Sequence, residues 1–222
     1  MVHPVSYERT NGESIVKSNE GDVQMSEKKP EVDTAEVIRF AFADASLGRV
    51  LAARSERGVC AVLLGADRGA LLEDLGNRFP SAELVEDPFD AGTVAAEVAA
   101  FIEHPIRDLD LPLDLRGTPF QQCVWTALRA IPAGTTASYT EIAATIGHPE
   151  SVRAVAGACG ANAVAVIVPC HRALRADGSL SGYRWGLARK KSLLEREART
   201  HGTSQYADDL FSIMPESSRK EG

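Results

Sequence analysis

The pattern of hydrophobic and polar positions becomes regular from Val37 onward and predicts a small α+β region. Three short apolar stretches separated by turn residues run through "VIRFAFADASLGRVLAARSERGVCAVLLG", which is typical of an antiparallel sheet of about three strands. The segments "RGALLEDLGNRFP" and "AGTVAAEVAAFIEHP" have helical periodicity. Between them, "AELVE" is a possible short strand. Nothing in this region indicates chemistry.

A third helix is predicted in "TPFQQCVWTALRAIPAG", where Thr118 is a good N-cap and Gln121 completes a capping box. Its apolar positions follow an i, i+4, i+8 stripe, so Cys123 and Trp125 are predicted to be packing residues. The stripe consists of Phe120, Val124 and Leu128.

Two shorter helices follow and predict a helix-turn-helix. The first lies in "ASYTEIAATIG", with a capping box formed by Ser138 and Glu141. The tripeptide "GHP" breaks it, and "ESVRAVAGACGAN" forms the second. Two short helices joined by a tight turn that contains glycine are typical of this motif.

The second of these helices has almost no long side chains on its predicted exposed face. A helix that reads base edges in the major groove needs long donors and acceptors, and here only Arg153 qualifies. Small residues permit close approach to a minor groove, or equally to another element of the protein, and the composition leaves both alternatives open. The predicted buried stripe is Val152, Val155, Ala156 and Cys159, and the opposite face is Arg153, Ala154, Gly157, Ala158 and Ala161.

The ends of the chain lack periodicity. Residues 1–34 are polar and are predicted to be a flexible leader, and residues 200–222 a flexible tail. Between them we predict an α+β domain over residues 35–115 and a mostly helical domain over residues 116–199.

Composition and charge narrow the class of protein. Of 222 residues, 44% are hydrophobic and 25% charged, which is ordinary for a globular protein. The net charge of −7 is uneven, because residues 116–198 hold ten basic and five acidic side chains, which leaves −12 on the remainder. A basic half is compatible with a surface that faces phosphates, or with a solvated basic face.

Location and metal binding are also constrained by the sequence. No apolar run approaches the ~18 residues needed to span a bilayer, and a cytoplasmic protein is expected. The four cysteines include no C-x-x-C pair and accompany only five histidines, so we expect neither a zinc site nor a disulfide framework. Cys60 and Cys159 are predicted to be small buried hydrophobes.

The stretch "VPCHRAL" places Cys170 beside His171, a possible nucleophile and base. On an extended chain, successive side chains point to opposite faces, so the two cannot easily share a hydrogen bond. A water molecule linking them would solve this problem, with Glu197 holding the far nitrogen of the imidazole. The alternative is a core cysteine at a strand end with an unrelated histidine and glutamate, and the residues alone do not decide between the two.

A turn and a loop follow the cysteine. Asp177-Gly178 predicts a hairpin turn, and the segment 181–186 is a loop bracketed by glycines that carries Tyr183 and Trp185. A helix is predicted from about Leu187 to Ala198.

Three segments resemble the O6-alkylguanine-DNA alkyltransferases, and among them the Ada-type members: "VPCHRALRADGSLSGYRWGLARKKSLLEREA", "GTPFQQCVWTALRAIPAGTTASYTEIAATIG" and "VRAVAGACGAN". The similarity runs from about residue 37 to residue 198. The resemblance implies a ribonuclease-H-like N-terminal domain followed by a helical domain with a helix-turn-helix. It also implies that Cys170 irreversibly accepts a methyl group from O6-methylguanine, and from O4-methylthymine, in duplex DNA.

The resemblance implies roles for individual residues. His171 acts through water as the base, Glu197 orients it, and Asn162 braces the turn that carries the cysteine. Arg153 enters the base stack in place of the flipped nucleotide, and Tyr139 promotes that rotation and contacts the base. The implied DNA-binding residues are Arg153, Ala154, Gly157, Ala158 and Tyr139, and the implied pocket residues are Ala173, Tyr183, Arg184, Trp185 and Lys190.

The same resemblance implies a monomer that acts once on alkylated double-stranded DNA and needs no cofactor. Two other classes of protein remain as alternatives. A sequence-specific transcription factor needs base-reading side chains on the second helix of the helix-turn-helix. A cysteine hydrolase needs an oxyanion hole and turnover.

Overall fold

The computed structural model describes residues 9–10, 13–14, 35–106 and 108–202. The chain divides into two compact units, Met1–Thr34 and Ala35–Gly222. In the first, β1 (Arg9–Thr10) pairs antiparallel with β2 (Glu13–Ser14). Most of the predicted leader and tail lies outside the described residues.

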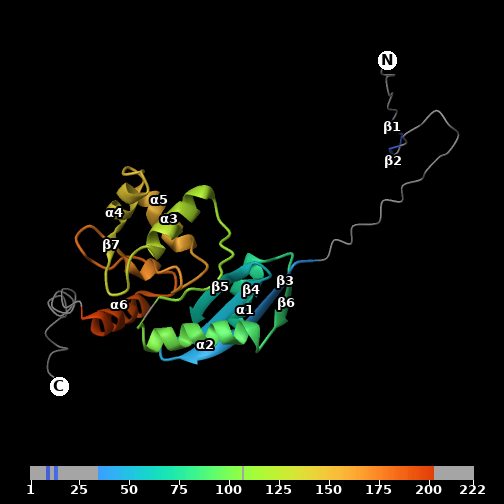
Figure 1. Cartoon of the computed structure of the whole chain (residues 1–222), viewed down its shortest axis with the longest axis horizontal. Helices are drawn as coiled ribbons and strands as arrows, with labels where there is room; N and C mark the ends of the chain where they lie inside the picture. Colours follow the sequence, from blue (N-terminus) through green and yellow to red (C-terminus); the bar gives the residue numbers. More distant parts are fainter. Residues whose placement is uncertain (1–8, 11–12, 15–34, 107, 203–222) are drawn as a thin grey trace, which may run out of the picture. The chain divides into compact units, whose positions relative to one another are not determined.

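A four-stranded sheet begins the second unit (Figure 1). Strands β3 (Val37–Ala45), β4 (Gly48–Ser55) and β5 (Gly58–Gly65) form an antiparallel meander. The short β6 (Glu83–Glu86) joins β3 in parallel, which gives the order β5-β4-β3-β6. The three predicted strands and the possible fourth are therefore confirmed.

Two helices accompany this sheet, as the periodicity predicts. Helix α1 (Arg68–Arg78) follows β5, and helix α2 (Asp90–Glu103) packs against β3 and β4 (Figure 1). The apolar side of α2 carries Val94, Val98 and Ile102 into the core, where they join residues of the sheet.

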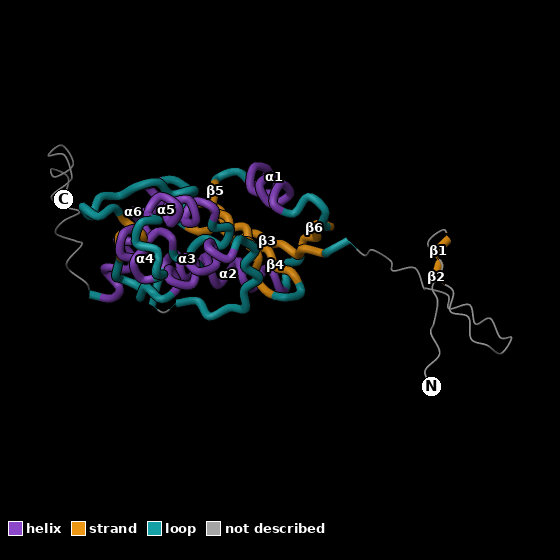
Figure 2. Tube along the Cα trace, turned by 90° about the horizontal axis from the view of Figure 1, so that it is seen from above, coloured by secondary structure: helices purple, strands orange, loops and turns teal. Residues whose placement is uncertain are grey.

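The second half of the unit is mostly helical (Figure 2). Helix α3 (Pro119–Arg129) begins with the predicted capping box, and α4 (Tyr139–Thr145) has the second one. Helix α5 (Val152–Ala161) packs against both. The remaining elements are β7 (Ala137–Ser138), which pairs with β8 (Ala173–Leu174), and α6 (Leu187–His201).

The prediction that Cys123 packs in the core is wrong. Helix α3 buries Val124, Trp125 and Leu128, and Cys123 is exposed. Successive positions on a helix differ by about 100°, so the residue before Val124 points away from the buried face. Trp125 is buried as predicted, at 3% exposure.

The outer edge of β5, away from β4, joins the sheet to the segment that leads to the cysteine. Val62 N–H donates to the Ala163 carbonyl at 2.9 Å, and Ala165 N–H donates to the Val62 carbonyl at 3.0 Å. Beyond this bridge the apolar run turns, with Val166 at φ +71°, and Cys170–Arg172 forms a single turn of 3₁₀ helix. The assumption from the sequence that the backbone is extended at Cys170 and His171 is therefore wrong.

The predicted boundary between residues 115 and 116 falls inside this second unit and stays a prediction. Across the described ranges, no helix has the length and apolar character needed to cross a membrane.

Candidate active site

Asn162 sets the geometry of the turn that carries the cysteine. Its side-chain oxygen accepts a hydrogen bond from Val164 N–H at 2.9 Å. Its amide nitrogen donates to the Val168 carbonyl at 2.8 Å and to Cys170 Sγ at 3.2 Å. One buried amide therefore fixes both ends of the turn and contacts the sulfur.

The Cys170 thiol is buried, at 4% exposure. Burial raises its pKa to about 11, although the Asn162 hydrogen bond and the charge of Lys190 oppose the shift. At pH 7 such a thiol is ionised in roughly one molecule in ten thousand. Cys170 therefore needs a base if it is to react as a thiolate.

His171 lies next to the cysteine and is fully buried. Its Nε2 lies 2.8 Å from Glu197 Oε1, and Nδ1 has no hydrogen-bond partner among the described residues. Because a carboxylate only accepts hydrogen bonds, Nε2 is the donor in this contact, and in the neutral imidazole Nδ1 is the nitrogen with the free lone pair. The structure thus leaves Nδ1 as the basic atom of the ring.

Arg172 joins the same buried network through the Glu197 carboxylate. Its Nε donates to both carboxylate oxygens at 3.2 and 3.0 Å, and its Nη2 donates to Oε1 at 2.9 Å. Burial alone raises the pKa of Glu197, but His171 and Arg172 together lower it to about 2. The carboxylate is therefore charged throughout the neutral range.

Sequence reasoning missed the role of Arg172. The guanidinium also donates to the Ile131 carbonyl at 2.6 Å and to Asp108 at 2.8 Å. The only available signal was the position of an arginine directly after the Cys-His pair, and its partners are at least 25 residues away in the sequence.

A pocket of about 440 Å³ opens beside Cys170. Its walls come from α4, α5 and the loop before α6. They include Tyr139, Ala156, Cys159, Gly160 and the loop residues Ser181, Gly182, Tyr183 and Arg184. Two of the predicted pocket residues, Tyr183 and Arg184, therefore line it.

Tyr139 lines this pocket with a phenol that can donate a hydrogen bond. Ser181 Oγ donates to the Tyr139 hydroxyl oxygen at 3.0 Å. Burial raises the pKa of Tyr139, so the phenol is protonated at neutral pH.

The other three predicted pocket residues do not line the cavity but support its walls. Lys190 is fully buried, and its Nζ donates to the carbonyls of Ala173 and Ser181 at 2.6 and 3.1 Å. Trp185 packs edge-on against Tyr183, with ring centroids 5.2 Å apart. Ala173, Trp185 and Lys190 are not among the residues that line the cavity, and their contact with a substrate stays a prediction.

Helix α5 presents a nearly bare surface. Arg153, Ala154 and Gly157 are exposed, as predicted, and Gly160 is exposed as well. A Cβ added at Gly157 or Gly160 would meet no atom within 4 Å. Packing inside the protein therefore does not explain these two glycines.

Two positions on α5 were assigned to the wrong face. Ala156 is exposed and lines the pocket, whereas Ala158 is buried at 2% exposure. The reason is Trp125, whose indole N–H donates to the Ala158 carbonyl at 2.9 Å and turns this side of α5 toward α3.

In the part of the chain that the structure describes, no group of three or more His, Cys, Asp or Glu side chains is placed to hold a metal ion.

The described structure thus combines a mixed α+β fold with a buried cysteine that Asn162 contacts and with a buried His171-Glu197 pair. Residues 119–199 match the family model of the 6-O-methylguanine DNA methyltransferase DNA-binding domain. The inducible methylated-DNA–protein-cysteine methyltransferase of Bacillus subtilis is 44% identical over 129 residues, 58% of this chain and 72% of that protein. The chain belongs to the family of methylated-DNA–protein-cysteine methyltransferases.

Two further relatives match a larger share of the chain. The bifunctional transcriptional activator/DNA repair enzyme Ada of Escherichia coli is 53% identical over 161 residues, 72% of this chain and 46% of Ada. The chain thus matches about half the length of this relative. A crystal structure of Mycobacterium tuberculosis O6-methylguanine methyltransferase aligns with a TM-score of 0.63 and 34% identity, over 74% of this chain and 94% of that one.

Proposed function

We propose that the protein repairs DNA by direct reversal, moving a methyl group from O6-methylguanine in duplex DNA to its own Cys170, once per molecule. O4-methylthymine is the second proposed substrate. The observation that carries the proposal is the buried Cys170, with Asn162 on its sulfur and the His171-Glu197 pair beside it. Family membership supports the same activity, and a related structure is described as OGT in complex with DNA.

In the proposed reaction, the proton of the Cys170 thiol passes through a water molecule to His171 Nδ1. The thiolate attacks the methyl carbon, the new S–C bond forms as the C–O6 bond breaks, and the electron pair remains on guanine. A proton from the Tyr139 hydroxyl neutralises the departing base, and the tyrosinate takes a proton back from solvent. Glu197 stabilises the imidazolium, and no cofactor takes part.

DNA is proposed to lie against α5, which together with α4 forms a helix-turn-helix. The bare surface at Gly157 and Gly160 permits close approach of a groove, as in minor-groove binding. Arg153 occupies the place of the flipped nucleotide, and the rotated base enters the 440 Å³ pocket. We further propose a ribonuclease-H-like fold for the sheet domain and a monomer that works in the cytoplasm.

Intact mass spectrometry after mixing with a duplex that contains one O6-methylguanine tests the function directly. We expect a single added methyl group on Cys170 and loss of the lesion in equal amounts. An unmodified protein, or a methyl group on another residue, would contradict the proposal. Repeated turnover without modification would favour a cysteine hydrolase instead.

Arg153→Ala is expected to slow repair of duplex DNA by roughly tenfold or more, with much less effect on free O6-methylguanine base. Flipping a base costs a few kcal/mol, and every 1.4 kcal/mol is a factor of ten. Rates on both substrates should be compared with those of Arg39→Ala, an exposed arginine on β3. Equal losses on duplex and free base would rule out the intercalating role.

Gly157→Leu is expected to weaken DNA binding without destabilising the fold. The added side chain meets no protein atom at its Cβ, and replacing a glycine inside a helix stabilises the helix by roughly 0.5–1 kcal/mol. The bulk projects into the proposed groove contact. Binding should be measured beside Gly157→Ala, and a Leu variant that binds DNA like wild type would remove α5 from the interface.

A further inference from the structure

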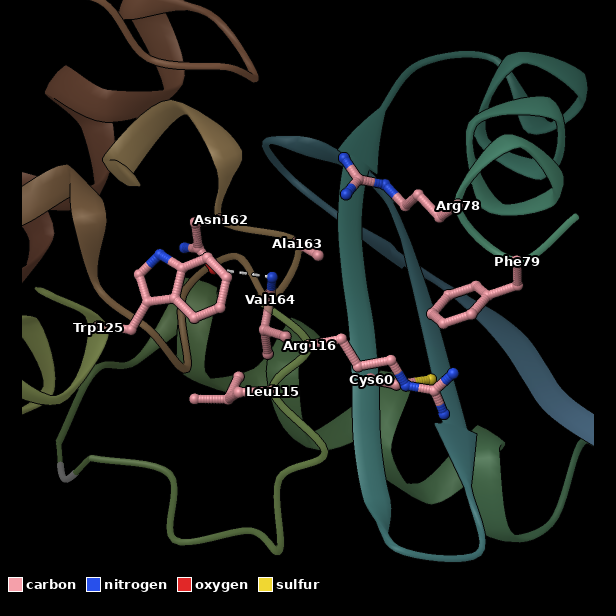
Figure 3. Close-up of a pocket in the computed structure, with 9 residues that line it drawn as sticks. All are labelled: Cys60, Arg78, Phe79, Leu115, Arg116, Trp125, Asn162, Ala163 and Val164. Carbon is pink, nitrogen blue, oxygen red and sulfur yellow. Dashed lines mark hydrogen bonds between the residues drawn. The ribbon is translucent and has the colours of Figure 1, made fainter. Parts of the chain in front are cut away.

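A second pocket, with Asn162 in its wall, shares no lining residue with the pocket beside Cys170 (Figure 3). It has a volume of about 150 Å³ and is lined by side chains from both halves of the unit. Arg78 reaches into it from the end of α1 and points toward Asn162 and Ala163, as Figure 3 shows. Phe79, Arg116 and Trp125 line other parts of the wall.

The guanidinium of Arg78 is incompletely satisfied. Its side chain is 17% exposed, and its Nε and Nη2 atoms are buried without a hydrogen-bond partner among the described residues. Nε lies 3.3 Å from Asp74 Oδ1, which is an ion-pair distance, but hydrogen-bond geometry is not met. Buried donors that lack an acceptor destabilise a protein, so an acceptor in the pocket would be favoured.

The charge around the pocket favours an anion. Asp74 is shared between Arg78 and Arg184, which contacts it at 3.0 Å, so two guanidinium groups face one carboxylate. Burial, followed by repulsion from Arg184, lowers the pKa of Arg78. Arg116, in contrast, is already neutralised by Asp114 and Glu36.

The remaining walls are aromatic and aliphatic. Phe79, Leu115, Trp125 and Val164 surround the space between Arg78 and Arg116. A cavity of about 150 Å³ is large enough for a benzene ring. Cys60 also lines the pocket, but burial raises its pKa to about 12, so this thiol does not offer a nucleophile at neutral pH.

We propose that this pocket is a binding site for a small aromatic carboxylate, whose ring lies among Phe79, Leu115 and Trp125 and whose carboxylate accepts hydrogen bonds from Arg78. The site is separate from the pocket beside Cys170, and its occupancy does not depend on alkyl transfer. One residue connects the two sites: Asn162 lines this pocket and also donates a hydrogen bond to Cys170 Sγ.

Benzoate is the probe, and ¹⁵N NMR of the full chain is the measurement. Saturable titration shifts are expected at the Trp125 indole N–H and at the Asn162 side-chain amide. Benzamide has nearly the same shape without the charge and should bind at least tenfold more weakly. Two results would overturn the proposal. One is that benzamide binds as tightly as benzoate. The other is that benzoate shifts neither the Trp125 indole signal nor the Asn162 side-chain amide signal.

Two variants separate the site from non-specific binding. Arg78→Met removes the charge and should weaken benzoate binding at least tenfold, while Arg39→Met, an exposed arginine on β3, should bind like wild type. Leu115→Phe keeps Arg78 and reduces the space for the ring, so it should also prevent binding. Thermal unfolding verifies that each variant is folded, and retention of wild-type affinity in both Arg78→Met and Leu115→Phe would exclude this pocket.

Discussion

Replacing Cys170 with Ser will abolish methyl transfer and leave affinity for unmodified duplex DNA unchanged. The substitution alters one buried atom, whereas the proposed DNA surface is on the exposed side of α5. A serine hydroxyl is a far weaker nucleophile than a thiolate. The expected mass spectrum shows no added methyl group after incubation with excess methylated duplex, and DNA binding should be measured by fluorescence anisotropy.

Cys159→Ser is the matched control, because Cys159 is the second thiol in the wall of the same pocket. Burial raises its pKa to about 12, and the described structure gives it neither a bond from Asn162 nor a neighbouring imidazole. We expect this variant to accept a methyl group at close to the wild-type rate. If Cys159→Ser loses transfer and Cys170→Ser retains it, the assignment of the nucleophile is wrong.

The sequence predicted those parts of the fold that depend on local interactions. The strands of the meander follow from short apolar stretches between turn residues, and the starts of α3 and α4 follow from capping boxes at Thr118 and Ser138. Each signal lies within a few residues along the chain. For that reason these elements could be placed without knowledge of their neighbours.

Features set by distant contacts were not predicted correctly. The rotation of α5 about its axis depends on its contact with Trp125, which lies 33 positions before Ala158. As a result Ala158 is buried and Ala156 is exposed, the reverse of the prediction. The turn at Val166 depends on the bridge from Val62 to the segment that follows α5. Hydrophobic periodicity contains no information about either partner.

The candidate site was predicted only in part from the sequence. The residues alone left a Cys-His-Glu relay and an unrelated core cysteine as equal alternatives, because His171 and Glu197 are 26 residues apart. Family resemblance favoured the relay, and the 2.8 Å contact between them supports it. The position of Asn162 beside the sulfur agrees with its expected role as a brace, but the buried partners of Arg172 were found only in the structure.

Glu197→Gln is expected to slow methyl transfer by roughly ten- to a hundredfold, because the neutral amide stabilises an imidazolium less well. The same change removes the charge that pairs with the buried Arg172 guanidinium, which is 1% exposed. Breaking a buried ion pair from one side costs roughly 3–5 kcal/mol. Single-turnover rates and denaturant unfolding should both be measured, with Glu195→Gln on the same helix as the control, since among the described residues Glu195 pairs with Lys191 alone, at 3.8 Å.

Measuring the free energy of unfolding as a function of pH distinguishes the effect of the Glu197 charge from the effect of its packing and hydrogen bonds. Since the pKa of this carboxyl falls from 4.5 to about 2 on folding, its contribution to the free energy of unfolding is complete above about pH 4.5 and is lost as the pH falls toward 2. That contribution is on the order of 3 kcal/mol. The stability difference between wild type and Glu197→Gln should therefore narrow by about this amount over that interval, whereas Glu195→Gln should follow wild type. A difference that stays constant with pH would mean that Glu197 stabilises the fold by packing and hydrogen bonding alone, and its charge would then have no part in holding His171 and Arg172 together.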